Sequence, residues 1–133
     1  MSRLKTILRL NAASCFGFGA LFALAPASVA AFLSDTPAPG WLILALGLGL
    51  LANGAHLVLA ASRAKLRAGE VLHFAIGDFL WVAATIALIV FGVWITTPAG
   101  IEAALAVALM VGAFGGLQIV GLQKMRRASS PAI

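Results

Sequence analysis

The sequence predicts an all-α membrane protein, with four transmembrane helices packed as a bundle in one domain that covers residues 1–133. Three observations carry this prediction. The chain is 62% hydrophobic and only 10% charged, whereas soluble domains are about half apolar and about a quarter charged. Four apolar segments each approach the roughly 20 residues that cross the hydrocarbon core of a bilayer. The basic residues fall into three groups, and each group lies beside the ends of these segments.

The predicted spans are separated by short connections, and the first and third connections contain Pro and Gly, which favour turns. The four spans comprise residues 7–25, 41–61, 71–95 and 101–122. Proline inside a helix removes a hydrogen bond and clashes with the preceding turn, so Pro26 predicts the end of the first span. We expect a short helix over 27–33 at the membrane interface. A signal peptide cut after Ala30 is the rival interpretation, but the apolar run is long, and we expect it to be retained.

The positions of the basic residues predict the orientation. Each of the three groups contains three Lys or Arg residues, and the first and third connections contain none. Loops rich in Lys and Arg stay in the cytoplasm, so both termini are expected there. The net charge of +5 is thus explained by topology and contact with anionic headgroups. We expect the lipid bilayer as a partner, and no nucleic acid. The groups are Arg3, Lys5 and Arg9; Arg63, Lys65 and Arg67; and Lys124, Arg126 and Arg127.

Small residues at intervals of four indicate where membrane helices approach each other closely. Span one carries Cys15, Gly19 and Ala23, and span two carries Ala45 and Gly49. Two interpretations stay open for the small residues of span four. They serve packing within the chain, or they form an interface with a second copy or a partner membrane protein. The span-four stripe consists of Ala104, Ala108, Gly112 and Gly116.

A polar layer is predicted in the cytoplasmic half of the membrane. Asp78 lies about seven residues inside span three, roughly 10 Å deep at 1.5 Å per residue. Asn53 lies at a similar depth in span two, and Gln118 approaches that level from span four. An acid in the membrane is costly unless it faces the helix interior and has partners. We therefore predict a network of Asp78 with Asn53, Gln118 and the inward-reaching side chain of Arg9, with Trp81 near the same helix face.

Three functional hypotheses follow from this layer. In the first, the network only holds the helices in register, and the protein is an accessory or scaffold subunit. In the second, Asp78 is the proton site of a small proton-linked transporter, because ionisable residues in membranes often mark transport paths. In the third, His56 and His73, at similar depth on consecutive antiparallel spans, ligate a haem b from both sides.

Enzymatic activity is not expected. The chain contains no P-loop, HExxH or GxSxG motif and no paired carboxylates, and no connection between spans exceeds about eight residues. The single cysteine, Cys15, excludes an internal disulfide and a cysteine-based metal cluster. We therefore expect no catalytic residues, no metal and, outside the haem hypothesis, no cofactor.

Three short features carry a resemblance that covers most of the chain. They are "RLNAAS" at Arg9–Ser14, Pro26 after the first span, and "GDFLW" at Gly77–Trp81. With them the chain resembles a group of small four-helix bacterial inner-membrane proteins with no assigned activity. The resemblance implies an inner-membrane location and supplies no catalytic residues. The small multidrug carriers have a similar length and span number, but they need an acid midway in the first span, where this chain has none.

Overall fold

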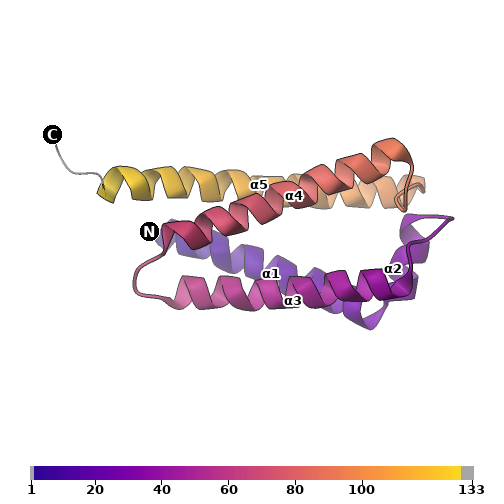
Figure 1. Ribbon diagram of the computed structural model, residues 1–133, viewed down its shortest axis with the longest axis horizontal. Helices are drawn as coiled ribbons and strands as arrows, with labels where there is room; N and C mark the ends of the chain where they lie inside the picture. The colour runs from indigo at the N-terminus through magenta and orange to yellow at the C-terminus, as the bar shows by residue number, and fades with distance from the viewer. Residues whose placement is uncertain (1, 130–133) are drawn as a thin grey trace.

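The computed structural model describes residues 2–129, and these form five helices without a strand (Figure 1). Four of the helices are long and apolar enough to cross a membrane. This confirms the predicted all-α class and is consistent with a multi-pass membrane protein. The fifth helix is short. In chain order they are α1 (Ser2–Leu24), α2 (Pro26–Leu33), α3 (Gly40–Ser62), α4 (Ala68–Phe91) and α5 (Pro98–Ser129).

Most of the apolar surface of the long helices points outward. Only 17–28% of the most apolar window of each helix is buried inside the protein. Large side chains such as Leu24, Val90 and Leu109 are more than 70% exposed. A water-soluble protein does not expose contiguous apolar patches of this extent. The outward faces are therefore suited to contact with lipid chains.

The long helices pack as two pairs. α1 packs along α3, and α4 packs along α5, while α1 also contacts α5 and joins the pairs. The α1–α3 crossing is close because two glycines face each other. A Cβ atom on Gly47 would lie 2.7 Å from the backbone nitrogen of Ala23 and 2.9 Å from the carbonyl oxygen of Gly19. The sequence pattern predicts Gly19 in this seam, but it assigns Ala45 and Gly49 on α3, and both of these are exposed.

The small residues of α5 are largely used inside the chain. Ala108 is buried, and Gly112 lies against the side chain of Val82 on α4. Gly115 lies one position before the end of the predicted stripe, and a Cβ atom added to it would lie 3.0 Å from the ring of Phe79. Of the two glycines in the stripe, Gly116 is the one with nothing within 4 Å of its Cβ position. Intramolecular packing, one of the two interpretations left open for this stripe, therefore accounts for Ala108 and Gly112.

Two helix ends differ from the ends of the predicted spans. α4 stops at Phe91, because Gly92 adopts a left-handed conformation (φ 65°) and its N–H bonds back to the last turn. This is the usual glycine cap of a helix, and residues 92–95 belong to the following turn. At the other end of the chain, α5 continues beyond residue 122 through the basic segment to Ser129. A membrane span ends where the apolar residues end, but the helix itself can continue into polar residues.

The short helix α2 begins at Pro26, which occupies the first helical turn, where a missing N–H costs nothing. Its last carbonyl groups are bonded to the α4–α5 connection. The backbone N–H of Thr96 donates to the Leu33 carbonyl at 2.8 Å, and the Thr97 hydroxyl donates to the Phe32 carbonyl at 2.7 Å. Thr97 also caps α5 by accepting the N–H of Gly100 at 3.0 Å. α2 therefore ties the two helix pairs together at one end of the molecule, which we call the α2 end.

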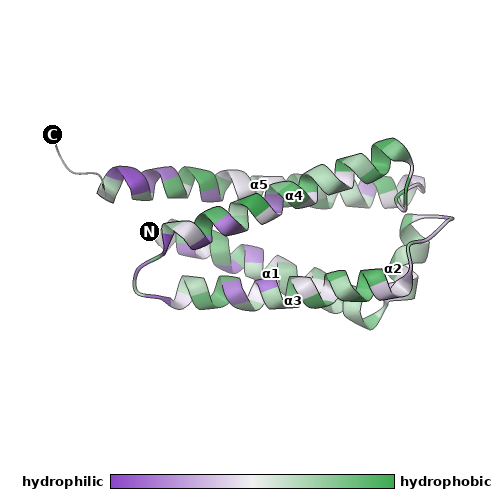
Figure 2. Ribbon diagram, in the orientation of Figure 1, coloured by the Kyte–Doolittle hydropathy of each residue, from purple (hydrophilic) through white to green (hydrophobic). Residues whose placement is uncertain are grey.

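The opposite end, which we call the basic end, holds the start of α1, the α3–α4 connection and the end of α5 (Figure 1). Lys5 Nζ donates to the Arg63 carbonyl at 2.7 Å, which joins α1 to that connection. Leu4 packs against Gly121 of α5. Hydrophilic residues gather at this end (Figure 2). The three basic groups of the sequence thus lie at the same end of the molecule.

Candidate functional site

The centre of the candidate site is a buried triad of polar side chains from three helices. Asp78 on α4 accepts the amide N–H groups of Asn11 on α1 and Gln118 on α5 at one oxygen, Oδ2, over 3.0 and 2.8 Å. Asn11 Nδ2 also donates to Gln118 Oε1 at 3.0 Å. All three residues are at least 93% buried. The triad provides the donors that an acid needs when it is removed from water, and it connects α1 to the α4–α5 pair.

The polar layer extends from the triad to α3. The Cys15 thiol donates to Asn11 Oδ1 over 3.8 Å, and Asn53 Nδ2 donates to Cys15 Sγ over 3.5 Å. Cys15 lies one helical turn after Asn11, so the two side chains share a face of α1. Each of the four long helices therefore contributes at least one polar side chain to a single chain of contacts.

Asp78 keeps one oxygen available. No described side chain or backbone group bonds to Oδ1, while every buried side-chain nitrogen or oxygen among the described residues has a partner. Oδ1 is therefore the accessible part of a side chain that is otherwise buried. Asp78 lines a cavity, and Oδ1 is the oxygen of this side chain that has no bonded partner among the described groups.

The predicted network differs from the observed one in two of its contacts. Arg9 is exposed, and its guanidinium donates to the Ala61 carbonyl at 3.5 Å at the basic end rather than to Asp78. Asn53 reaches Asp78 only through Cys15 and Asn11. The residue that sequence reasoning missed as a partner is Asn11, two positions after Arg9. Its signal was present, because Asn11 is a polar residue inside an apolar span, as Asn53, Asp78 and Gln118 are.

The two histidines lie together at the basic end, but their surroundings do not fit a haem. Their ring centroids are 5.6 Å apart, and both rings pack against the ring of Phe74. Nε2 of His56 bonds to Glu70 at 2.8 Å, and Glu70 also pairs with Arg63. A porphyrin between these rings would have to displace the buried Phe74 and break the bond to Glu70. Among residues 2–129, no group of three or more His, Cys, Asp or Glu side chains could hold a metal ion.

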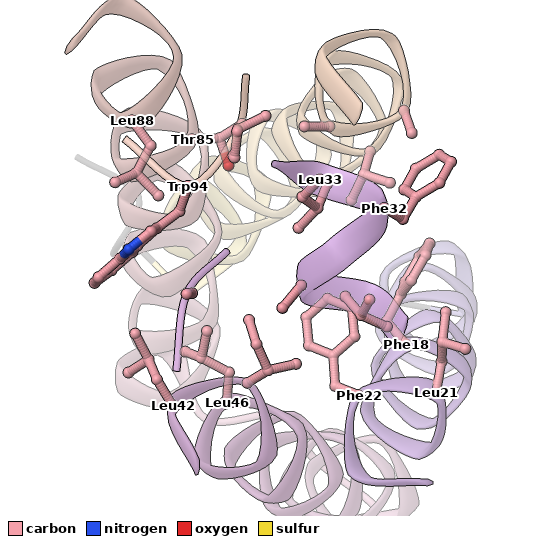
Figure 3. A pocket seen from close by; sticks show the side chains of 18 of the residues that line it. Phe18, Leu21, Phe22, Phe32, Leu33, Leu42, Leu46, Thr85, Leu88 and Trp94 are labelled. Carbon is pink, nitrogen blue, oxygen red and sulfur yellow. The ribbon is translucent and has the colours of Figure 1, made fainter. Parts of the chain in front are cut away.

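A cavity of about 450 Å³ lies near the α2 end, between the two helix pairs (Figure 3). All five helices contribute to its walls, and nearly all the wall atoms are apolar. The one wall hydroxyl from α4, on Thr85, bonds to the Trp81 carbonyl at 2.8 Å and is thus already satisfied. We call this cavity the apolar chamber. Its side chains include Phe18, Phe22, Leu33, Leu46, Leu88 and Trp94.

A second cavity of about 290 Å³ lies next to the first, on the side of the basic end. Phe18, Trp81 and Val107 line both cavities, so these three residues form the boundary between them. The Trp81 ring is stacked on Phe22, with the ring centroids 6.4 Å apart. We call the second cavity the polar chamber, because its walls include Asn11, Ser14, Cys15, Asn53, His73 and Asp78. Trp81 was predicted near the Asp78 face, and it lines the same chamber.

No protein-family model matches this chain, and neither a curated protein nor a solved structure matches it.

Proposed function

We propose that this protein is a multi-pass protein of the bacterial inner membrane with both termini in the cytoplasm. Four apolar helices of sufficient length support a membrane location. The gathering of all three basic groups at one end supports the orientation, because positively charged loops stay on the cytoplasmic side. In this orientation α2 lies near the outer surface, and the Asp78 triad lies in the inner half of the membrane.

We further propose a non-enzymatic role as an accessory or scaffold subunit. The observation that carries this proposal is the Asn11–Asp78–Gln118 triad, whose hydrogen bonds are made within the protein and connect α1 to α4 and α5. Such a network fixes the positions of helices against one another, which a scaffold requires. The connections 34–39, 63–67 and 92–97 are too short to form an aqueous catalytic domain.

The test is purification of the tagged protein in mild detergent, followed by identification of stoichiometric companions. A scaffold subunit retains a partner protein in the wild type and in the outward-facing control Leu109→Ala. It loses that partner in Asp78→Leu, which disturbs the helix arrangement. A wild-type protein that purifies alone as a monodisperse species contradicts the scaffold role.

One observation favours a second candidate, the proton-linked transporter. Asp78 lines the polar chamber, and its Oδ1 has no bonded partner among the described groups, so a proton can bind this oxygen without breaking the triad. In this case Asp78→Asn keeps the fold but abolishes flux driven by a pH gradient in proteoliposomes. Unchanged proton flux in this variant, measured with a dye enclosed in the vesicles, eliminates the candidate.

A further inference from the structure

The two chambers adjoin and differ sharply in chemistry. The apolar chamber offers aromatic and aliphatic walls, whereas the polar chamber beside it offers amide, hydroxyl, imidazole and carboxylate groups. Their volumes, about 450 and 290 Å³, taken together lie in the range of small-molecule sites. Sites of that kind combine apolar walls with a few polar groups that orient the ligand. The pair of chambers has this composition, and its amide, imidazole and carboxylate groups all lie in the polar chamber.

The charges around the chambers select the kind of polar group that can enter. Among residues 2–129, Asp78 is the only acidic side chain on the walls of either chamber, and no Lys or Arg lines them. The basic side chain that lines the polar chamber is the imidazole of His73. Arg9 and Lys5 bond to backbone carbonyls at the basic end. The available oxygen, Oδ1, is a hydrogen-bond acceptor without a donor. A cationic group that donates a hydrogen bond is therefore stabilised in this chamber, and an anionic head group is repelled.

We propose that the two chambers together bind one single-chain lipophilic amine. Its apolar body fills the apolar chamber, and its ammonium group donates to Asp78 Oδ1 and to the amide oxygen of Asn53. The ammonium supplies the missing donor and neutralises the carboxylate, while the Asn11 and Gln118 bonds to Oδ2 stay in place. This proposal is independent of the scaffold role, because it needs only the cavity and the available oxygen.

Tryptophan fluorescence tests the proposal directly. Trp81 and Trp94 line the apolar chamber, whereas the third tryptophan, Trp41, is 70% exposed. The experiment uses Trp41→Phe protein in phosphatidylcholine nanodiscs. The probes are 11-bromoundecylamine, 11-bromoundecanol and 11-bromoundecanoate, which share the quenching bromine and the chain but differ in the head. We expect saturable quenching by the amine, with an affinity at least about tenfold higher than for the carboxylate, as close charge pairs provide.

Two substitutions locate the site. Asp78→Asn reduces the preference of the amine over the carboxylate to less than about threefold, because it removes the charge that distinguishes the two heads. Ala104→Phe places a ring in the apolar chamber and abolishes saturable quenching. Its matched control is Leu109→Phe on the outward face of α5, where the residue is 79% exposed, and it retains the quenching. Because Asp78→Asn leaves the chamber open, it remains informative if Ala104→Phe does not fold.

The proposal is overturned if quenching rises in proportion to the probe concentration, is equal for the three head groups and is unchanged in Ala104→Phe. Such quenching reflects partition of the probe into the bilayer alone. Nanodiscs that contain phosphatidylethanolamine provide a further arm. If this lipid competes with the amine and phosphatidylcholine does not, the site belongs to a membrane lipid headgroup, and the proposal of a free amine is overturned. No competition from either lipid supports the free amine.

Discussion

The hydrogen bonds of Asp78 are asymmetric between its two oxygens, and this asymmetry separates a structural from a ligand-binding role. Oδ2 accepts both amides of the triad, so it belongs to the helix framework. Oδ1 has no bonded partner among the described groups, and Asp78 lines the polar chamber, so Oδ1 is the atom that can exchange a proton or meet a ligand. A single side chain can therefore hold three helices together and still present an acceptor to a cavity.

Substitutions of Asp78 should differ in their effect on stability. Asp78→Asn keeps a carbonyl oxygen that can accept both amides, so the change should be small. Asp78→Leu leaves the buried N–H groups of Asn11 and Gln118 without this acceptor. We expect the free energy of unfolding to fall by about 1–2 kcal/mol. This loss exceeds the average of about 0.6 kcal/mol for a membrane hydrogen bond, because buried donors without an acceptor carry an added cost. Unfolding in mixed micelles with increasing denaturing detergent measures both. A Leu variant as stable as the wild type contradicts the structural role of the triad.

The triad should also behave as one unit. In Asn11→Leu/Asp78→Leu/Gln118→Leu, the triad groups are replaced by apolar groups together, so no triad amide is left without an acceptor, and only the weak donor Cys15 loses its acceptor, Asn11 Oδ1. We expect the triple variant to lose less stability than the sum of the three single variants, by about 1 kcal/mol or more, as residues in one network are not additive. The same unfolding assay measures the four variants. Simple additivity would show that the three side chains act independently.

At the scale of the elements, helix crossings depend on which residues face each other and not on how many small residues a span contains. The α1–α3 crossing uses Gly19 and Gly47, whose Cβ positions would collide with backbone atoms. Gly49 lies on the same helix, but nothing is within 4 Å of its Cβ position. Sequence spacing identified glycine-containing seams, but it selected the wrong face of α3.

Gly47 and Gly49, which lie on the same helix, offer a matched test. Gly47→Ala forces α1 and α3 apart and should cost about 1–3 kcal/mol, as overpacking usually does. Gly49→Ala adds the same methyl group in open space and should be neutral or stabilising by up to about 1 kcal/mol, because alanine favours helix more than glycine. Thermal unfolding in detergent compares the two variants. Equal effects would show that the α1–α3 contact is not as close as described.

Considered as a whole, the molecule has two ends of different character. The basic end carries the three groups of Lys and Arg, and the α2 end is held together by hydrogen bonds between α2 and the α4–α5 connection. The chambers lie between the two helix pairs, and α4 makes its main helix contact with α5. The proposed membrane orientation places the polar chamber toward the cytoplasm and the apolar chamber toward the outside.

Cysteine labelling tests that orientation. In a Cys15→Ala background, single cysteines at Thr36 and Ala64 occupy exposed positions in the first and second connections. We expect a membrane-impermeant maleimide added to intact spheroplasts to label Thr36→Cys strongly, and to label Ala64→Cys only after permeabilisation. Labelling of Ala64→Cys from the outside, with none at Thr36→Cys, would reverse the topology.

Much of this protein followed from the sequence alone, and the physical reason is that hydrocarbon imposes a simple constraint. A backbone in lipid must bond to itself, so four long apolar runs predicted four helices, and Pro26 predicted both the break after the first helix and the short helix beyond it. The cost of an acid in the membrane predicted that Asp78 would be buried with polar partners, and the Gln118 amide does donate to it at 2.8 Å.

The identity of the other partners was decided only by the tertiary structure. Depth along a span can be counted from the sequence, but rotation about the helix axis and the choice of neighbouring helix cannot. These depend on the close fit at Gly19 and Gly47 and on the pairing of α4 with α5. That packing brings Asn11 to Asp78, leaves Arg9 at the basic end, and opens two adjoining chambers between the helix pairs. Composition determined that the chain forms four helices long and apolar enough to cross a membrane, whereas side-chain packing determined what the buried acid Asp78 can touch.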